Sequence, residues 1–248
     1  MSSAEQVIAS KIPLVVIVGP TAVGKTEFSL PLAEHFSAEI VSADSRLFYR
    51  RLDIGTAKPT PQERQRVPHH LIDVADPAET WSLALFQQAA RAAIEDIHQR
   101  GHLPFLVGGT GQYIHAVTRG WSPPAAIPDP SLRFELEELV KENGPHWLHA
   151  ELMKVDPDAA RIIDPLNVRR TIRALEVFCL TGRKFSSQRS TSDIPYRLLT
   201  IGLTMPRDAL YARIDARVER MLAEGLVDAV RGLLAQGYGY DLPSMSAL

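Results

Sequence analysis

The sequence predicts an α/β protein whose parallel sheet is flanked by helices and which carries a helical insertion domain. Two apolar runs rich in β-forming residues, 14–18 and 103–107, each lead into a glycine-rich loop. A helical pattern of apolar residues over 83–100 lies between them, and such alternation of strands and helices indicates a parallel sheet. A proline-rich stretch at 121–130 then separates this part from a block of helical patterns, which predicts a domain boundary.

The composition is that of an ordinary globular protein. The chain has 248 residues, of which 45% are hydrophobic, enough for a large packed interior. A formal net charge of −2 gives no overall sign of a nucleic-acid partner. The single cysteine, Cys179, excludes an intramolecular disulfide and suits a reducing compartment. Neither a signal peptide nor a run of about 18 apolar residues is visible, so we expect a cytoplasmic protein without a membrane partner.

The first strand leads into a phosphate-binding loop. Residues 19–26, GPTAVGKT, fit the pattern G-x-x-x-x-G-K-[ST], in which backbone N–H groups surround phosphates and a lysine ammonium reaches them. The helix that follows points its positive N-terminal end at the loop, and Pro31 is expected to kink it. A sheet of the P-loop NTPase kind is therefore predicted. The residues expected to bind phosphate are Gly19, Pro20, Thr21, Ala22, Val23, Gly24, Lys25 and Thr26.

Two features of nucleotide hydrolases are missing from the sequence. Such enzymes need an aspartate at the end of an apolar strand to help hold magnesium, whereas residues 103–111 read LPFLVGGTG without an acid. The nearest match to a guanine-recognising Asn-Lys-x-Asp motif, at 153–156, begins with Met153. Use of ATP by a small-molecule kinase nevertheless stays open, because phosphate chemistry alone does not exclude it.

Polar residues follow the second predicted strand, 39–42, at the place where ligands bind in parallel sheets. Asp44 there suits a loop-capping role and a catalytic role equally well. In PHHLID, residues 68–73, the neighbouring His69 and His70 fit a structural turn better than a metal site, because adjacent side chains point apart on most backbones.

The insertion is predicted to be helical over 132–142, 147–155 and 164–181. Asp164 is expected to cap the last of these helices, with Pro165 as its first residue and Gly182 as its end. Beyond the insertion, a strand over 197–205 and a helix over 208–236, broken near Gly225, complete the prediction. The residues expected to form the buried stripe of helix 164–181 are Val168, Ile172, Leu175 and Cys179.

A basic segment is hidden by the nearly neutral overall charge. Between Asn167 and Ser190 there is one acid, Glu176, and six bases, which gives a local charge of +5. On the residues alone, contact with RNA and a solvated helix face are equally good interpretations. The six bases are Arg169, Arg170, Arg173, Arg183, Lys184 and Arg189.

Together these stretches resemble the tRNA dimethylallyltransferase family, whose members prenylate the adenosine beside the anticodon. The motifs stand in the family's order over residues 19–177, and LYARIDARVERMLAEGL continues the likeness to about residue 226. The combination of DIGTAKP with GGTG is highly specific. The family usually continues through further helices beyond the end of this sequence, so we expect its C-terminal part to be missing here. The motifs are GPTAVGKT, SADSRLFYRRLDIGTAKP, PHHLID, GGTGQYI and NVRRTIRALEV.

The resemblance implies that the loop holds the pyrophosphate of dimethylallyl pyrophosphate as a leaving group, with Mg²⁺ as cofactor held at Thr26. The exocyclic amine of the adenosine 3′ of the anticodon would attack the allylic carbon. That amine must lose a proton, for which a carboxylate is chemically apt, and Asp44 matches the family's proposed base. Lys25 would offset charge on the pyrophosphate, and Thr110 would approach the amine or the leaving group.

The resemblance also implies the remaining contacts. Arg213 and Arg217 are expected to clamp phosphate oxygens. We expect residues 1–122 and 193–248 to form the core, residues 123–192 to contact the anticodon loop, and the protein to be a monomer. The residues expected to contact tRNA are Asp44, Ser45, Arg46, Leu47, Thr110, Gln112, Val168, Arg169, Arg170, Thr171 and Arg173.

Three other functions remain open at this point. A prenyltransferase acting on free adenine nucleotides is the nearest, and the insertion with its basic helix argues for RNA instead. A kinase using ATP on the same loop is the second. A non-catalytic RNA-binding module, whose loop merely holds an anion, is the third.

Overall fold

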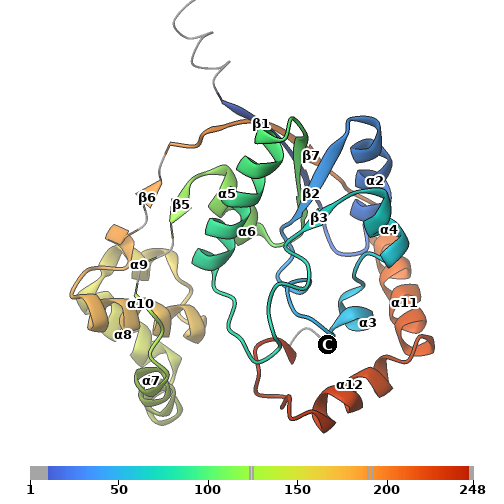
Figure 1. The fold of residues 1–248 in the computed structure, drawn as a ribbon. Coiled ribbons are helices and arrows are strands. Elements are labelled where there is room, and N and C mark those ends of the chain that lie inside the picture. Colours follow the sequence, from blue (N-terminus) through green and yellow to red (C-terminus); the bar gives the residue numbers. More distant parts are fainter. Residues whose placement is uncertain (1–10, 123, 125, 189, 192, 246–248) are drawn as a thin grey trace, which may run out of the picture. The chain divides into compact units, whose positions relative to one another are not determined.

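The computed structural model describes residues 11–122, 124, 126–188, 190–191 and 193–245, and the chain divides into two compact units (Figure 1). The first unit comprises residues 1–119 and 193–248, and the second comprises residues 120–192. The sequence predicts the corresponding boundaries after residues 122 and 192. Each unit is described by itself below.

A five-stranded parallel sheet forms the centre of the first unit. The strands lie in the order β3-β2-β4-β1-β7, and every neighbouring pair is parallel. The predicted α/β class with a parallel sheet is therefore confirmed, although β7 ends earlier than expected and the short β3 was not predicted. The strands are β1 (Ile12–Val18), β2 (Ala38–Ser42), β3 (His69–His70), β4 (Leu103–Gly108) and β7 (Tyr196–Gly202).

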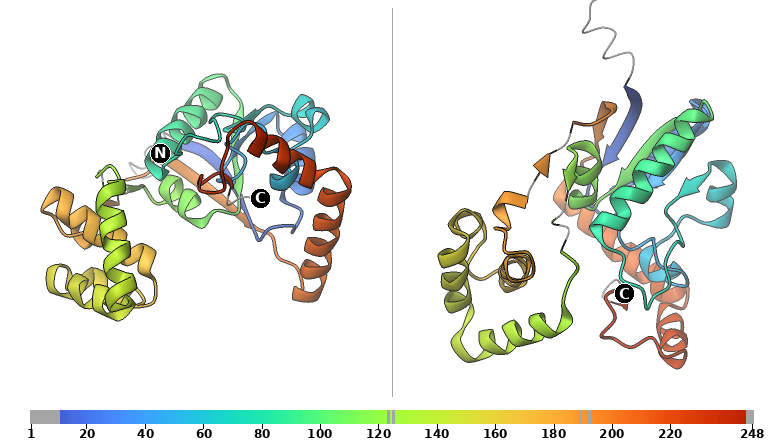
Figure 2. Two further views of the ribbon diagram at one scale, coloured as in Figure 1. Left: turned by 90° about the horizontal axis from the view of Figure 1, so that it is seen from below. Right: turned by 60° about the vertical axis from the view of Figure 1, so that its left-hand side comes forward.

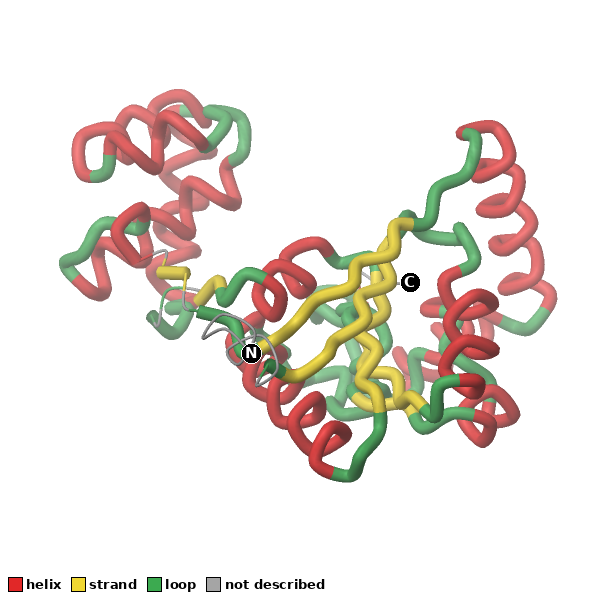
Figure 3. Tube along the Cα trace, turned by 90° about the horizontal axis from the view of Figure 1, so that it is seen from above, coloured by secondary structure: helices red, strands yellow, loops and turns green. Residues whose placement is uncertain are grey.

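Helices cover both faces of the sheet (Figure 3). Successive side chains of a strand point to opposite faces, and β1 is apolar on both. Val16 packs with Phe86 of α5 on one face, while Ile17 packs with Leu30 of α2 on the other. The helices of this unit are α2 (Lys25–His35), α3 (Asp53–Thr56), α4 (Pro61–Arg66), α5 (Leu83–Gln99), α6 (Gly111–Thr118), α11 (Arg207–Ala223) and α12 (Leu226–Ala235).

The helix ends follow local capping chemistry. Ser82 caps α5, because its hydroxyl accepts a hydrogen bond of 3.2 Å from Leu85 N. Gly225, with φ of 95°, separates α11 from α12 as predicted, since a left-handed residue ends one helix and begins the next. The helix α2 is one element from Lys25 to His35 and includes Pro31. None of the described helices is both long and apolar enough to span a bilayer.

The histidines of PHHLID have structural partners. His70 Nε2 lies 2.7 Å from Glu39 Oε2, and Arg100 donates to the same buried carboxylate. Hydrogen bonds from Arg100 and then from His70 lower the pKa of Glu39 to about 2. His69 Nδ1 lies 2.7 Å from Val67 O. Within the described residues, no group of three or more His, Cys, Asp or Glu side chains could hold a metal ion.

The second unit is a small helical bundle (Figure 2). Its core includes Leu148, Leu152, Ile172 and Leu175. The chain enters and leaves through β5 (Trp121–Ser122) and β6 (Ser190–Thr191), which pair antiparallel. The helices are α7 (Pro130–Asn143), α8 (Pro145–Val155), α9 (Pro157–Ile162), α10 (Val168–Thr181) and the short 3₁₀ helix η1 (Ser186–Gln188).

The helix α10 differs from its prediction at both its start and its buried face. It begins at Val168 with Asn167 as cap, because the residues just before it form a turn, in which Asp164 accepts from Leu166 N at 2.8 Å. Cys179 was expected in the buried stripe, and this is wrong, since its side chain is exposed. The face that packs inward passes through 171, 174, 175 and 177 and also carries the fully buried Glu176.

Candidate active site

The phosphate loop connects β1 to α2 at the carboxyl end of the sheet. Gly24 precedes α2 with φ of 97°, a conformation that L side chains rarely adopt. The Lys25 ammonium donates to Gly19 O at 3.0 Å and to Pro20 O at 2.9 Å, so it folds over its own loop. The α2 N-terminus and this ammonium make the loop a site for anions.

The loops after β2 and β4 touch each other beside the phosphate loop. Gly108 makes this possible, because a Cβ there would lie 2.3 Å from Ala43 O. Thr110 N donates to Ala43 O at 3.4 Å, and the Thr110 hydroxyl accepts from Ser45 N at 3.3 Å. A Cβ on Gly109 would lie 3.4 Å from Lys25 Nζ. The three loops thus converge at neighbouring strand ends, where parallel sheets bind ligands.

Asp44 stands at the start of the loop after β2. Its Oδ1 accepts a hydrogen bond of 3.0 Å from Arg46 N, which is the loop-capping role foreseen from the sequence. The same carboxylate acts electrostatically on both Lys25 and Arg217. The second carboxylate oxygen has no role in the turn, so Asp44 combines a capping contact with a position beside the phosphate site.

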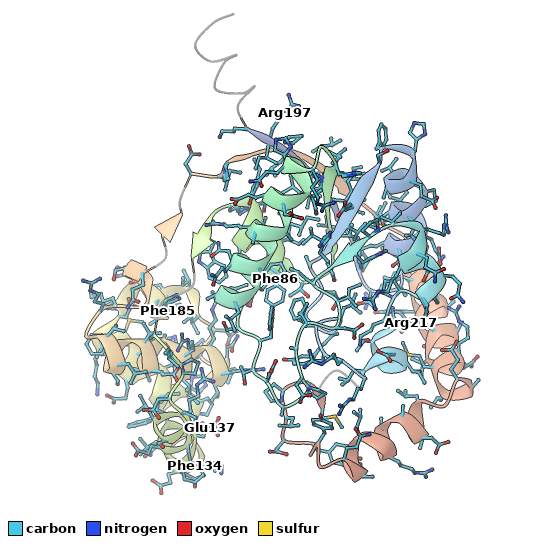
Figure 4. The ribbon with its side chains drawn as sticks, in the orientation of Figure 1. Phe86, Phe134, Glu137, Phe185, Arg197 and Arg217 are labelled. Atoms are coloured by element: carbon cyan, nitrogen blue, oxygen red, sulfur yellow. The ribbon has the colours of Figure 1, made fainter. Side chains whose placement is uncertain are left out.

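Arg217 brings a second cation to the site from the other end of the chain. It lies on α11 (Figure 4), and its Nη2 donates to Thr56 O at 3.2 Å. Burial lowers the pKa of Arg217, while the Asp44 carboxylate opposes that change. Burial likewise lowers the pKa of Lys25, opposed by Asp44 and reinforced by Arg217. Two partly desolvated cations near one carboxylate favour a bound anion that would restore the charge balance.

Arg213, one helical turn before Arg217, lies at the mouth of the phosphate loop. Its Nη2 forms an ion pair with Glu27 Oε1 at 2.9 Å and lies 3.7 Å from where a Cβ on Gly24 would be. The family resemblance implied that both arginines contact phosphate, but no local pattern indicated Glu27 or Thr56 as their partners. Those contacts join residues 186 and 161 positions apart in the chain.

A cavity of about 520 Å³ opens from the phosphate loop along the sheet. Gly19, Pro20 and Gly109 form its loop end, and Val18 and Leu198 form part of its floor. Ile114 and His115 of α6 line its side. Thr118, Arg119 and Thr200 also line the cavity, so it is only partly apolar. A partly apolar pocket that ends at a phosphate loop can hold a hydrocarbon chain attached to phosphate.

The residues expected to contact tRNA fall into two groups. In the first unit, Asp44, Ser45, Arg46, Leu47 and Thr110 are half-buried around the converging loops, and Gln112 is exposed at the start of α6. The remaining residues lie on α10, in the second unit. Each group is consistent with a surface formed by one unit alone.

On α10, only part of the predicted basic group presents free charge. Arg169 and Arg170 are exposed. Arg173 instead donates to Glu176 Oε2 at 2.5 Å and to Ala126 O at 2.7 Å, and Thr171 is buried with its hydroxyl donating to the backbone. Val168 packs partly against the core of the unit.

Arg173 and Glu176 neutralise each other inside the unit, a pair already subtracted in the net charge of +5, so that charge rests on the other bases of the segment. Arg133 also donates to the buried Glu176, at 2.8 Å. Arg183 and Lys184 are exposed, whereas Arg189 lies outside the described residues.

Fold and site together define an α/β protein of the P-loop type, in which a loop suited to anions lies beside the loops after β2 and β4. Residues 47–248 match the family model described as IPP transferase, and residues 12–74 match the model described as isopentenyl transferase. The chain belongs to the IPP transferase family, as the resemblance in its motifs indicated.

The relatives agree with this assignment. The chain is 60% identical over 237 residues to a tRNA dimethylallyltransferase of Roseiflexus sp. strain RS-1, covering 96% of this chain and 78% of the relative. The corresponding protein of Roseiflexus castenholzii is 62% identical, with the same coverage.

Two solved structures share the fold. The tRNA isopentenylpyrophosphate transferase of Bacillus halodurans superposes with a TM-score of 0.66 at 49% identity, covering 95% of this chain and 74% of that one. A eukaryotic dimethylallyltransferase solved while acting on tRNA superposes with a TM-score of 0.73 at 30% identity, covering 93% of this chain and 57% of that one.

The close approach of the loops generates a prediction about Gly108. Gly108→Ala should lower the free energy of unfolding by about 1–3 kcal/mol, because the added methyl would overlap Ala43 O and push β2 and β4 apart. Gly111→Ala is the matched control, since nothing lies within 4 Å of its Cβ position, and it should be neutral or slightly stabilising. Urea titration of both variants measures the difference. Equal stability would contradict the tight contact.

Proposed function

We propose that this chain transfers a dimethylallyl group from dimethylallyl pyrophosphate to the exocyclic amine of the adenosine 3′ of the anticodon in tRNA, releasing pyrophosphate. The observation that carries the assignment is the convergence of Lys25, Arg217 and Asp44 at one phosphate loop, beside a loop after β4 that holds no acid. Relatives at 60–62% identity are named tRNA dimethylallyltransferases.

The leaving pyrophosphate gains negative charge as its bond to carbon breaks. The backbone N–H groups of residues 19–26 and the α2 N-terminus would hold its oxygens. The Lys25 ammonium would exchange the carbonyls of Gly19 and Pro20 for phosphate oxygens. Arg217 would add the second cation, and Arg213 would reach the outer phosphate after giving up Glu27. These contacts strengthen as the charge develops, so they lower the barrier rather than only improving binding.

Mg²⁺ fits the oxygen donors of this site. Thr26, the second residue of α2, offers a hydroxyl beside the phosphate loop, and Mg²⁺ commonly binds through one or two protein oxygens together with substrate phosphates and water. We therefore assign its protein ligand to Thr26. When bound, the ion would supply further charge neutralisation on the leaving pyrophosphate.

Asp44 would take the proton that the amine loses. As the amine nitrogen forms its bond to the allylic carbon, the bond from that carbon to the pyrophosphate oxygen breaks, and the nitrogen becomes cationic unless a proton leaves. The Asp44 carboxylate keeps Oδ1 in the turn with Arg46 N, which leaves its other oxygen to accept the proton. Thr110, whose hydroxyl accepts from Ser45 N, would orient the amine next to it.

The cavity beside the phosphate loop provides a place for the hydrocarbon chain. Its floor and side include Val16, Val18, Ile114 and Leu198. These apolar side chains would hold the five-carbon chain and keep water from the allylic carbon, which reacts with water if exposed.

The adenosine must leave its stack to react. Proteins that modify a base extract it into a pocket, and sequence-specific RNA recognition usually targets splayed single-stranded loops. The half-buried residues 44–47 would meet the extracted base, and the exposed Arg169 and Arg170 of α10 would hold the RNA backbone. A cytoplasmic location fits this substrate, since tRNA modification of this kind takes place where tRNA is used. The monomeric state stays a prediction.

The first test separates prenyl transfer from its rivals. The protein is incubated with radiolabelled dimethylallyl pyrophosphate, Mg²⁺ and either tRNA or AMP, without ATP. Labelled tRNA and unlabelled AMP are expected, because the basic helix of the insertion suits RNA and not a free nucleotide. No ATP should be needed, because the acid that nucleotide hydrolysis needs is missing after β4. Labelled AMP would instead identify a free-nucleotide prenyltransferase. A requirement for ATP with release of ADP would support the kinase, and no turnover with intact tRNA binding would support a binding module.

The base is tested by Asp44→Asn, which preserves shape and removes the proton acceptor. Prenyl transfer in single turnover with saturating substrates should slow by ~10² to 10⁴, the range that a positioned acid or base supplies. Dissociation constants for both substrates should change by only a few-fold. Asp228→Asn, on the exposed surface of α12, is the control and should keep the parent rate. Transfer by the Asp44 variant within threefold of the parent rate would leave Asp44 as a loop cap only.

The α10 surface is tested with a double variant in which glutamine replaces both Arg169 and Arg170. If each contacts one phosphate, the slope of log affinity for tRNA against log salt should fall by about 1.4 to 1.8. Affinity for dimethylallyl pyrophosphate should not change. Arg161→Gln, an exposed arginine paired with Asp158 in the same unit, should keep the parent slope. An unchanged slope in the double variant would return both arginines to the role of solvated surface charge.

A further inference from the structure

Lys58, in the DIGTAKP segment, is a buried cation outside the three loops of the site. Its side chain is only 5% exposed. The ammonium donates to Tyr49 O at 2.6 Å, to Asp53 Oδ1 at 2.6 Å and to Asp73 Oδ1 at 2.5 Å. These contacts use all three of its donors, so Lys58 is held in one place and is not an ordinary surface lysine.

One partner of Lys58, Asp73, also bonds the start of the segment that follows β2, residues 44–58. Asp44 O accepts from Leu47 N at 3.3 Å, and Leu47 O accepts in turn from Asp73 N at 3.1 Å. Asp73 therefore binds the beginning of the segment through its backbone and the end of it through its carboxylate. Arg64 occupies the other carboxylate oxygen at 2.7 Å and fixes its orientation.

The same segment also reaches Arg217. Lys58 N donates to Asp53 O at 3.2 Å and thereby ends the short helix α3. The last residue of α3 is Thr56, whose carbonyl accepts from Arg217 Nη2. The ammonium of Lys58 also binds the carboxylate of Asp53, the first residue of α3, and so helps to hold the helix whose last carbonyl contacts the second cation of the site.

We propose that Lys58 is a positioning residue for prenyl transfer. It fastens residues 44–58 so that the Asp44 carboxylate faces the amine while the Thr56 carbonyl directs Arg217 toward the pyrophosphate. All three of its side-chain acceptors belong to residues 49–73, so it acts through the segment and not on the reacting atoms. The catalytic consequence presupposes the proposed prenyl transfer, whereas the ordering of the segment does not.

Lys58→Met is a suitable test because it keeps the buried stem and removes the ammonium. Neither carboxylate would be left buried without a partner. The Asp53 side chain is 68% exposed to water, and Asp73 keeps its ion pair with Arg64. We therefore expect the variant to fold with residues 44–58 loosened.

Two measurements are made on the parent and on Lys58→Met. Backbone amides of residues 45–58 should exchange hydrogen at least ~10-fold faster in the variant, because local opening becomes easier. Single-turnover transfer should slow by ~10- to 100-fold, the cost of a misplaced catalytic group. The dissociation constant for dimethylallyl pyrophosphate should stay within about twofold, since the phosphate loop keeps its own contacts.

Control variants make the outcome decisive. Arg231→Met removes an exposed cation paired with Asp228 on α12 and should change neither measurement. Asp73→Asn removes the charge facing Lys58 but keeps the backbone bond to Leu47, so it should show the same pattern more weakly. It also replaces Lys58→Met should that variant fail to fold.

Three results would overturn the inference. Unchanged exchange would mean that Lys58 does not order the segment. Faster exchange with an unchanged transfer rate would mean that the order of the segment does not matter for the chemistry. An equal loss of affinity for dimethylallyl pyrophosphate would mean that Lys58 acts on the core as a whole. A parent protein that transfers no prenyl group would instead refute the proposed function, and the exchange measurement would still test the ordering.

Discussion

The contact between Gly108 and Ala43 is the constraint on which the site depends. A carbonyl oxygen of the β2 loop occupies the space that a side chain at the end of β4 would need. Because the two strand ends meet without a side chain between them, Thr110 can hydrogen-bond the β2 loop through its backbone and accept from it through its hydroxyl. The Asp44 carboxylate and the Thr110 hydroxyl, which are 66 residues apart in the sequence, are thereby fixed beside one phosphate loop.

That constraint explains which parts of the site could be predicted from sequence. The phosphate loop is a local device, since its glycines, lysine and following helix are contiguous, and a pattern of eight residues was enough to find it. Asp44 and Thr110 could also be predicted from the sequence, because each follows a recognisable strand. The carboxyl ends of parallel strands share one edge, so their position followed from the fold class.

The features that could not be predicted depend on contacts between residues far apart in the sequence or on the burial of a side chain. The periodicity of apolar residues indicates neither. Arg217 donates to the backbone carbonyl of Thr56. Any residue at that position would supply the same carbonyl, so the sequence does not indicate the contact. No local pattern distinguishes Glu176 from a surface acid, yet it is fully buried between two arginines. The +5 charge of the basic segment was counted correctly, but a count of charges does not reveal which of them cancel inside the unit.

Glu39 lies at the beginning of β2, whereas Asp44 follows the end of the same strand. The folded protein holds the pKa of Glu39 at about 2, below the ~4.3 of an unfolded chain. Its contribution to stability is therefore complete above that unfolded value and disappears as pH falls toward 2. The carboxylate that adds pH-dependent stability thus lies at one end of β2, and the residue assigned as the base follows the other end. A substitution of Glu39 would therefore change the acid dependence of stability at the opposite end of β2 from Asp44.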